Sequence, residues 1–505
     1  MKRKLTLFGF FTLTASMLMS ADEYPAFAQS GLVAVIFLVA AAIVWFLPVA
    51  LCSAEMATID GWEDGGIFTW IKNSLNERMG FVAVCMQWLQ NTINFITMLY
   101  FIIGALSFAL DMPSLNTNPL LKYALFLLIF WGLTFSQLGG ISRTDVIVKI
   151  SFIGGIIIPS CIFLGLAIAY LVQGHPAQID LSLPSSITTI QHHFSISSFV
   201  PFILAFAGIE ASASYAGNMK NPKHEYPIAI LILVFFAVGL DALGGLAVGI
   251  VVPANELSLN SGVLQAVQIA IQQVVPALSF MVRIVAFLLV LGMVGEVSSW
   301  VVGPVRTLYV VAQDQLLPQY FAKANANDVP VRLVVLQGII VSVVGAILTL
   351  LFGGNNAAFK IAMSLTVMMY MVTYILLFVG YLRMIFVKDG VHRDFQILGG
   401  KVMKLLIGSV GLVSTIIVFI ATFVPSADVL KLMHAESYVL ITSVLFITVL
   451  SLVLISYQHE SKRNAKHSVT VKKVPHHVVN RWIYPKARSN HYVQKTNEFP
   501  KEKSS

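Results

Sequence analysis

Long apolar stretches recur along most of the chain, and they constrain its fold more than any other feature. Twelve stretches, bounded by proline, glycine or charge, reach the roughly 20 residues that cross a bilayer. Only 11% of the residues are charged, against about 25% in an average soluble protein, which excludes a soluble globular enzyme. The sequence therefore predicts an all-α polytopic membrane protein with about 12 transmembrane helices, at residues 5–28, 32–56, 80–110, 120–138, 148–172, 197–218, 227–252, 279–305, 332–352, 358–385, 402–424 and 436–457.

The basic residues indicate how the chain is oriented. The net charge is +8, and residues 459–505 hold eleven Lys and Arg against three acidic residues, so the excess lies in the C-terminal tail and predicts no nucleic-acid partner. With the N terminus inside, 28 of the 32 basic residues fall on cytoplasmic segments. The positive-inside rule then places both termini in the cytoplasm. The four exceptions are Lys122, Arg283, Lys360 and Lys431.

A cleavable secretory signal is the alternative for residues 1–29, which combine a basic start, an apolar run and small residues. Its removal would leave eleven helices, and the basic loops and the basic tail would no longer share one side of the membrane. We therefore interpret this segment as the first helix.

Two of the predicted helices carry polar breaks, which a bilayer tolerates only where the backbone lines a cavity or packs in protein. Asp22 and Glu23 precede Pro25 in the first helix, and small residues surround Glu210 in the sixth. Breaks five helices apart indicate two inverted five-helix repeats, whose discontinuous helices 1 and 6 meet at the centre of the membrane. Helix N-termini there attract a carboxylate, and free carbonyls accept hydrogen bonds from an ammonium, so the site suits an amino acid.

The predicted domain organisation follows from these breaks. Residues 1–457 form a twelve-helix transporter domain, with repeats at about 5–172 and 197–385 and two extra helices within 402–457. Residues 458–505 form a basic cytoplasmic tail.

Side chains from neighbouring spans complete the predicted substrate site. Glu296 and Trp300 lie one helical turn apart in the eighth span, and Tyr370 and Tyr374 have the same spacing in the tenth. Structural alternatives are packing for the tyrosine pair and an ion pair with Arg283 for Glu296. The predicted substrate-binding residues are Asp22, Glu23, Gly208, Glu210, Ser212, Glu296, Trp300, Tyr370 and Tyr374.

Asp241 and the cysteines are expected to have no part in the site. Asp241 stands alone in the seventh span, and we assign it a structural role. Cys52, Cys85 and Cys161 lie within apolar stretches, without disulfide or zinc-site spacing, so no metal or cofactor is expected.

Three loop motifs, in order, resemble those of the amino acid–polyamine–organocation (APC) superfamily. They are residues 55–58 with 65–70, residues 221–227, and residues 306–330. Within this superfamily the chain is most similar to the bacterial glutamate/γ-aminobutyrate (GABA) antiporters of acid resistance. That similarity is carried by residues 5–31, 294–304, 365–374 and 485–492.

The resemblance implies a LeuT-like fold with the five-plus-five inverted repeat, in the inner membrane of a bacterium. It implies exchange of extracellular glutamate for intracellular GABA by a protein embedded in membrane lipid. We expect functional coupling to a cytosolic amino acid decarboxylase, because a decarboxylase that consumes one proton per turn would make the exchange a net removal of protons. It also implies that Glu210, Glu296, Trp300, Tyr370 and Tyr374 hold binding positions. It implies, finally, that the basic tail is a plug over the cytoplasmic mouth. From the histidines and basic residues of the tail we further expect this plug to be pH-sensitive, with contacts from His476, His477, Lys486, Arg488 and His491.

Two departures from that family keep an alternative open. Asp22 stands where an uncharged residue is expected, and a second carboxylate beside Glu23 repels an anionic substrate unless it is protonated. Asp22 thus favours a related exchanger of a cationic amino acid for its decarboxylated amine. Lys486 stands where an arginine is expected, which removes a bidentate donor from the plug.

Other classes of protein are less consistent with the sequence. A membrane enzyme would need a chemical motif, and the chain has no HExxH, nucleophile elbow or Walker loop. Nothing resembles the selectivity ring of a channel. A receptor that senses substrate without transport could share the fold, and a flux measurement separates it from a transporter.

Deletion of residues 471–505 tests whether the tail is a plug or a polybasic strip on anionic lipid. Five of the eleven histidines lie in the tail, and they gain charge between about pH 7 and pH 5, which makes a cationic plug repel itself. We expect the truncated protein to transport toward neutral pH, with little change at about pH 5. Equal pH profiles for the truncated and full-length proteins would show that the tail is not the gate.

Overall fold

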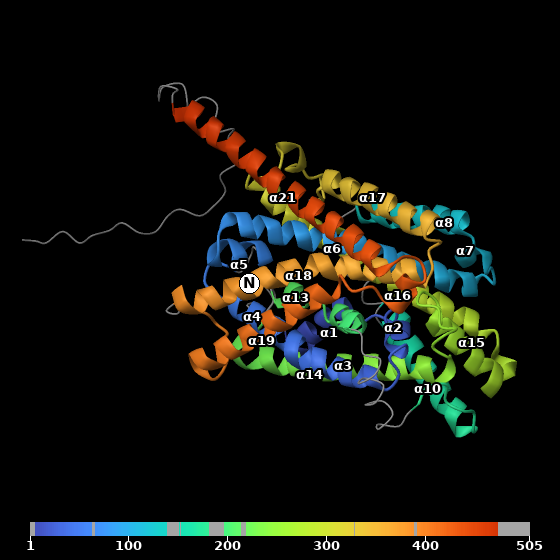
Figure 1. The fold of residues 1–505 in the computed structure, drawn as a ribbon. Coiled ribbons are helices and arrows are strands. Elements are labelled where there is room, and N and C mark those ends of the chain that lie inside the picture. The colour runs from blue at the N-terminus through green and yellow to red at the C-terminus, as the bar shows by residue number, and fades with distance from the viewer. Residues whose placement is uncertain are drawn as a thin grey trace, which may run out of the picture. The chain divides into compact units, whose positions relative to one another are not determined.

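The computed structural model describes residues 6–62, 66–138, 151, 153–180, 196–213, 219–327, 329–387 and 391–472 (Figure 1). Within these ranges the regular elements are helices and no strand is formed; an antiparallel β-bridge joins Ile59 to Arg393. The chain forms two compact units, residues 1–457 and residues 458–505. In the second unit, the described residues 458–472 are helical.

Ten helical segments of the described chain are long and apolar enough to cross a membrane, and the protein is therefore a multi-pass membrane protein. They coincide with ten of the twelve stretches that the sequence predicts. The segments are Val33–Ala57, Glu77–Ala109, Pro119–Gln137, Ile153–Val172, Lys223–Val251, Met281–Gln313, Val331–Leu351, Asn356–Val387, Gly400–Ala421 and Ala435–Asn464.

The other two stretches, 5–28 and 197–218, contain pairs of short helices instead of one long helix. In the first, α1 (Leu7–Leu18) and α2 (Tyr24–Ala28) are separated by residues 19–23. In the second, α12 (Val200–Leu204) and α13 (Ile209–Ala213) are separated by residues 205–208. The remaining helices that the text uses are α3 (Val33–Ala41), α4 (Leu47–Ala57), α5 (Gly66–Ser74), α6 (Glu77–Ala109), α7 (Ser114–Thr117), α8 (Pro119–Gln137), α10 (Ile158–Val172), α14 (Pro222–Val251), α15 (Gly262–Val274), α16 (Met281–Gln313), α17 (Val331–Ala346), α18 (Asn356–Val387), α19 (Gly400–Ala421), α20 (Ala427–Leu430) and α21 (Ala435–Lys472).

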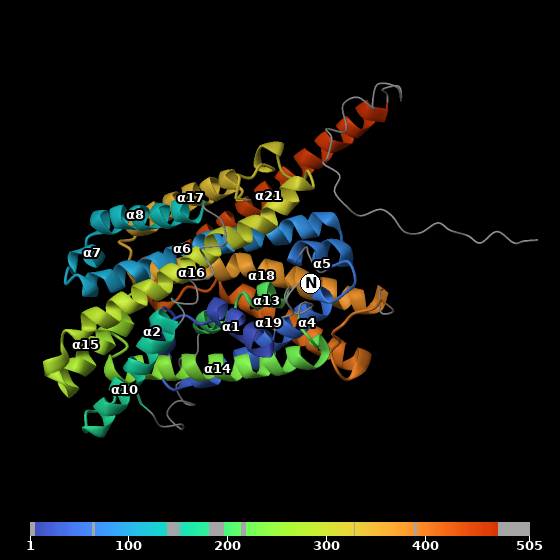
Figure 2. The ribbon, with the colours of Figure 1, turned by 180° about the vertical axis from the view of Figure 1, so that it is seen from behind.

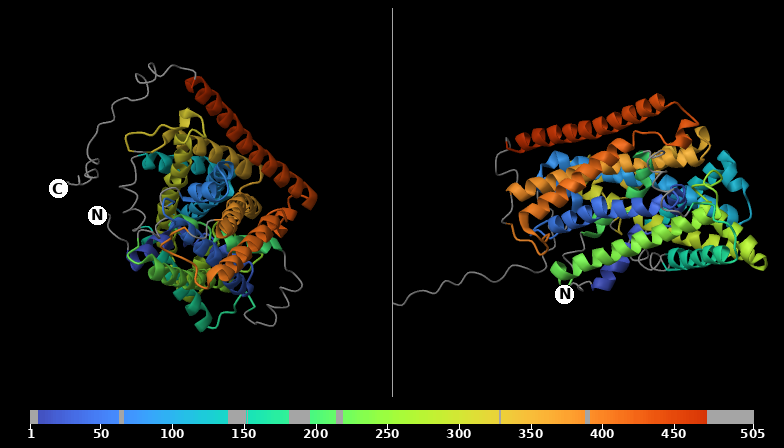
Figure 3. Two further views of the ribbon diagram at one scale, coloured as in Figure 1. Left: turned by 90° about the vertical axis from the view of Figure 1, so that its left-hand side faces the viewer. Right: turned by 60° about the horizontal axis from the view of Figure 1, so that its bottom comes forward.

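Helix α6 lies at the centre of the first unit. It is apolar around most of its circumference, which is the pattern of a helix buried on all sides. It packs most extensively against α18 and α16, and less extensively against α5, α8 and α17. Figures 1 and 2 show α8 and α17 on one side of α6 and α14 on the opposite side of the unit. In the left view of Figure 3, α6 is surrounded by the other helices.

Glycines on α14 bring the first broken segment close to that helix. A Cβ atom at Gly244 would lie 2.6 Å from the ring of Tyr24, and one at Gly245 would lie 2.7 Å from Cβ of Phe27. Larger residues at these positions would push α2 away from α14. The glycines therefore fix where the chain continues after the break at residues 19–23.

A buried ionic cluster ties α4 to the segment between α18 and α19. The Glu55 side chain is 0% exposed, and its Oε1 accepts hydrogen bonds from Arg393 and Lys404, each at 2.6 Å. Its Oε2 accepts from the Tyr381 hydroxyl at 2.9 Å and from the Ile397 N–H at 3.1 Å. All four bonds converge on one carboxylate, so Glu55 accounts structurally for part of the motif at residues 55–58.

Replacement of Glu55 by glutamine tests this cluster. The change leaves two buried cations facing a neutral amide, and loss of one partner of a buried ion pair costs about 3–5 kcal/mol. We expect a clear fall in the apparent melting temperature of the purified protein. Asp111→Asn is the control. Asp111 pairs with Arg283, but the two side chains are 73% and 61% exposed, respectively, so this ion pair contributes at most about 1 kcal/mol to stability. Equal shifts in the two variants would contradict this account.

Candidate functional site

A small central cavity lies where the two broken segments meet α6, α16 and α18. Its volume is about 40 Å³, enough for about three water molecules and too small for an amino acid. Five of the predicted substrate-binding residues line it, and α6 supplies most of the other polar groups. The lining residues are Leu18, Ser20, Asp22, Glu23, Gln90, Asn91, Asn94, Thr97, Met98, Leu204, Ala207, Glu296, Trp300, Phe359, Met363 and Tyr370.

The local sequence explains why α1 stops and α2 starts where they do. Pro25 occupies the first turn of α2, where a missing N–H leaves no hydrogen bond unmade. The Glu23 carbonyl accepts hydrogen bonds from the N–H groups of Ala26 and Phe27, at 2.9 and 3.2 Å. Asp22 and Glu23 are therefore held at the junction, where their side chains reach the central cavity.

Four carboxylates gather at this junction. The charges of Asp22, Asp241 and Glu296 all act on Glu23, and Asp22 also acts on the other two. Asp241 is thus not isolated, as its place in the sequence suggests, but belongs to the acidic surroundings of the cavity. Within the described residues no Lys, Arg or His forms an ion pair with any of the four, so the cavity is strongly anionic when they are ionised.

Glu296 and Ser20 present unpaired polar atoms to the cavity. Glu296 Oε2 and Ser20 Oγ are buried without a hydrogen-bond partner, although the Ser20 hydroxyl lies beside the carboxylates of Asp22 and Glu296. The alternative pairing of Glu296 with Arg283 does not occur, because Arg283 binds Asp111 at 2.8 Å. Buried polar atoms are rarely left unsatisfied, so these two are suited to a bound molecule.

Glu210 does not line the central cavity, and its carboxylate oxygens accept hydrogen bonds from side chains of α6 and α18 instead. Oε1 accepts hydrogen bonds from Gln87 Nε2, at 2.8 Å, and from the Tyr370 hydroxyl. Oε2 accepts from the Tyr374 hydroxyl at 2.5 Å. Glu210 is 2% exposed, and its hydrogen bonds join α13 to α6 and α18. Glu210 therefore fixes the position of the second broken segment.

Gly208 makes the turn of that segment possible. Its φ of +108° lies in a region that other residues rarely adopt, and a Cβ atom there would lie 3.1 Å from the Trp300 ring. The Gly208 N–H donates to the Tyr374 hydroxyl at 3.2 Å. Tyr374 packs edge-on against Trp45 and lies beside Tyr370, with ring centroids 4.8 and 4.6 Å away. The tyrosine pair therefore supports the break, while Tyr370 also reaches the cavity.

The predicted site omits the polar face of α6. Gln90, Asn91, Asn94 and Thr97 recur at helical spacing on one side of an apolar helix, and all four line the cavity. Asn91 Nδ2 also donates to the Trp300 carbonyl at 3.1 Å, which joins α6 to α16. This periodic polar stripe was the signal in the sequence that would have identified them.

The remaining predicted residues lie beyond what the structure describes. Ser212 is in α13, but its side chain is outside the described part. The predicted plug contacts are outside the described residues altogether: His476, His477, Lys486, Arg488 and His491.

Comparison with known proteins places the chain in a family. Residues 5–455 match the sequence model of the amino acid permease family. The chain is 45% identical over 497 residues to the glutamate/gamma-aminobutyrate antiporter of Lactococcus lactis subsp. lactis (strain IL1403), which covers 98% of this chain and 99% of that protein. An uncharacterized transporter of Legionella pneumophila is 30% identical over 432 residues, 85% of this chain and 91% of that protein. A probable agmatine/putrescine antiporter of L. lactis is 22% identical over 445 residues, 84% and 89% of the two chains. Because the family model and the most similar relatives match nearly the whole length, the chain belongs to the amino acid permease family.

Proposed function

We propose that this amino acid permease exchanges extracellular glutamate for intracellular GABA in a bacterial inner membrane. The observation that carries the proposal is the 45% identity, over 98% of the chain, to a protein named for that exchange. The central cavity supports it, because amide and hydroxyl groups of α6 lie opposite two broken segments that expose helix ends. Exchange coupled to a cytosolic decarboxylase that consumes a proton would contribute to acid resistance.

The proposed fold completes the twelve helices from the two short-helix pairs. In this proposal α1 with α2 is the discontinuous first transmembrane helix, and α12 with α13 is the discontinuous sixth. The two inverted repeats then span residues 5–172 and 197–385, with both termini in the cytoplasm and residues 458–505 as a plug. Support comes from the breaks at residues 19–23 and 205–208 and from the distribution of the basic residues.

The mechanism is alternating access around the central cavity. At about 40 Å³ the cavity excludes substrate, so the broken segments must separate from α6 and α18 to admit it. The hydrogen bonds of Glu210 hold the second segment against both helices and must rearrange in that step. As the pH falls, cavity carboxylates that take up protons repel the carboxylates of glutamate less.

The acidic cavity also favours a second candidate. Four carboxylates without a cationic partner among the described residues attract a cationic amino acid and its decarboxylated amine. Competition separates the two candidates, since only the second predicts that arginine or agmatine displaces glutamate at low concentration.

Proteoliposomes test the exchange directly. We expect uptake of labelled external glutamate into vesicles loaded with GABA and little uptake into empty vesicles. An obligatory exchanger returns to its outward-open state only with an internal substrate bound. The measurement is initial uptake at several pH values, with protein-free vesicles as the control. Uptake at equal rates into empty and loaded vesicles would refute obligatory exchange.

Glu296→Gln and Glu210→Gln separate a residue in the cavity from one that holds the segment. Glu296→Gln removes an unpaired cavity charge, so we expect the pH profile of glutamate uptake to move toward neutral by about one pH unit, with folding intact. Glu210→Gln weakens three hydrogen bonds outside the cavity lining, so we expect slower exchange of every substrate with little change in the profile. Identical behaviour of the two variants would remove this distinction.

A further inference from the structure

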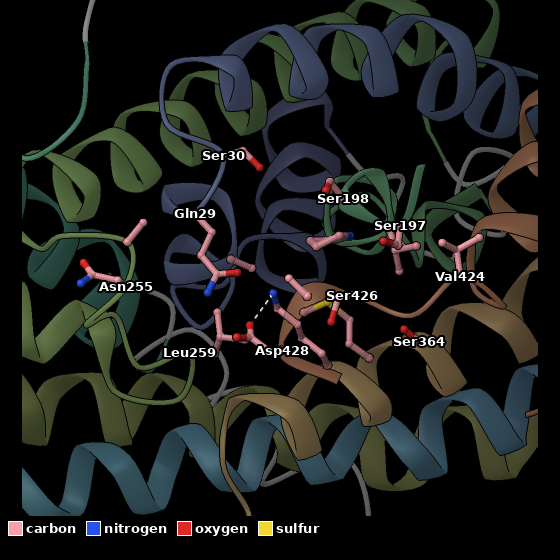
Figure 4. A pocket seen from close by; sticks show the side chains of 17 residues that line it. Gln29, Ser30, Ser197, Ser198, Asn255, Leu259, Ser364, Val424, Ser426 and Asp428 are labelled. Carbon is pink, nitrogen blue, oxygen red and sulfur yellow. Dashed lines mark ion pairs between the residues drawn. The ribbon is translucent and has the colours of Figure 1, made fainter. Parts of the chain in front are cut away.

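A second, larger cavity lies between α2, α12, α18 and α20, and we name it the α20 cavity. Its volume is about 420 Å³, within the range of roughly 300–1,000 Å³ that holds small molecules. Figure 4 shows polar side chains from several elements around this space. Its polar and charged lining consists of Gln29, Ser30, Ser197, Ser198, Asn255, Lys360, Ser364, Ser426 and Asp428.

The α20 cavity adjoins the central cavity. Met363 lines both cavities; on α18, Lys360 lies about one turn before Met363 and Ser364 directly follows it, and both line the α20 cavity. Helix α12 is shared in the same way, since Pro201 lines the α20 cavity and Leu204 lines the central one. In the proposed orientation the α20 cavity is on the extracellular side, so external substrate passes through it first.

An ion pair between Lys360 and Asp428 crosses the α20 cavity, marked by the dashed line in Figure 4. The Lys360 Nζ and the Asp428 Oδ2 are 2.8 Å apart, and each side chain is 21% exposed. Of the described residues that line the two cavities, Lys360 alone carries a positive charge. Lys360 is therefore the group that attracts the carboxylate of a substrate on its way to the anionic central cavity.

Asp428 is held in its ionised form. Partial burial by itself raises the pKa of Asp428, but the hydrogen bonds and charges of Lys360 and Lys431 outweigh it and leave the pKa below its ordinary value. On its other side Asp428 faces a further hollow, which Lys122, Glu256 and Lys431 also line. Asp428 therefore stays ionised, and paired with Lys360, at an acidic pH at which an isolated aspartate is already partly protonated.

One hydroxyl of the α20 cavity has no partner. Ser426 precedes α20, yet its side chain makes no capping hydrogen bond, and its buried Oγ is unpaired. Lys360, Asp428 and Ser426 therefore offer a cation, an anion and a free hydroxyl around one space of amino-acid size.

We propose that the α20 cavity is a second binding site for zwitterionic amino acids, in which Lys360 binds the carboxylate and Asp428 binds the ammonium. The zwitterion replaces one ion pair by two, so neither side chain loses its partner when the pair opens. A diamine offers no carboxylate and is repelled by Lys360. The inference rests on the proposed amino acid exchange and adds a selective site in front of the central cavity.

Thiol protection tests this site without transport. Ser198→Cys places a half-buried thiol in the lining of the α20 cavity, and Cys161→Ser removes the exposed native cysteine, while Cys52 and Cys85 are buried. In detergent, we expect glutamate and GABA to slow labelling of the new thiol by a small maleimide, and putrescine to have no effect. Ser279→Cys, an exposed serine outside the cavity, is the control that no ligand should protect.

Lys360→Gln in the same background distinguishes this site from an effect of the central cavity. We expect half-protection to need at least about tenfold more glutamate, because an ion-paired carboxylate is worth at least about that factor in a partly buried site. Lys431→Gln is the matched control: it also removes a cation that contacts Asp428, at 3.2 Å, but it does not line the cavity. If Lys360→Gln is not monodisperse, Asp428→Asn replaces it, with the same expected shift.

Two results would overturn the inference: no protection by glutamate with Lys360 intact, or the same half-protection after Lys360→Gln. Failure of the proposed function shows differently, because thiol protection without exchange in vesicles would refute exchange and leave the site standing.

Discussion

A peptide group inside a bilayer has no water to bond, so every interruption of a helix there must be held by protein. This constraint shapes the centre of the molecule. The interruption at residues 205–208 is held by Glu210, whose carboxylate accepts hydrogen bonds from α6 and α18, and by Tyr374, which accepts the Gly208 N–H. The interruption at residues 19–23 is held by the close approach of α2 to the glycines of α14. The central cavity exists because these two supports keep helix ends apart from one another.

Buried carboxylates serve two opposite purposes in this fold. Glu55 is completely enclosed, and two cations, a hydroxyl and an N–H satisfy it, so the loss of one partner would leave a buried charge uncompensated. Asp22 and Glu296 are enclosed beside other carboxylates, and Glu296 keeps an unpaired oxygen. Such an arrangement costs stability, and a transporter retains it where a substrate or a proton completes the site.

Helix α18 connects the parts of the proposed transport path. Along its length it carries Lys360 at the α20 cavity, Met363 in the wall between the cavities, and the two tyrosines that hold Glu210. A shift of the broken segments relative to α18 therefore changes both cavities together. This continuity gives a physical route by which binding at the first site bears on opening of the second.

The sequence by itself determined the membrane class and ten of the helices, because apolar length is a local property. It also predicted polar interruptions in two further stretches, in which the structure has pairs of short helices. It also predicted a common site for Asp22, Glu23, Glu296, Trp300 and Tyr370, and in the structure all five line the central cavity. Only the tertiary structure decided which way each side chain faces. Glu210 points away from the cavity and accepts hydrogen bonds from three donors on α6 and α18. Asp241 on α14 interacts with the carboxylate of Asp22, and the polar stripe of α6 lines the central cavity. Those outcomes depend on contacts between segments far apart in the chain, which no local pattern encodes.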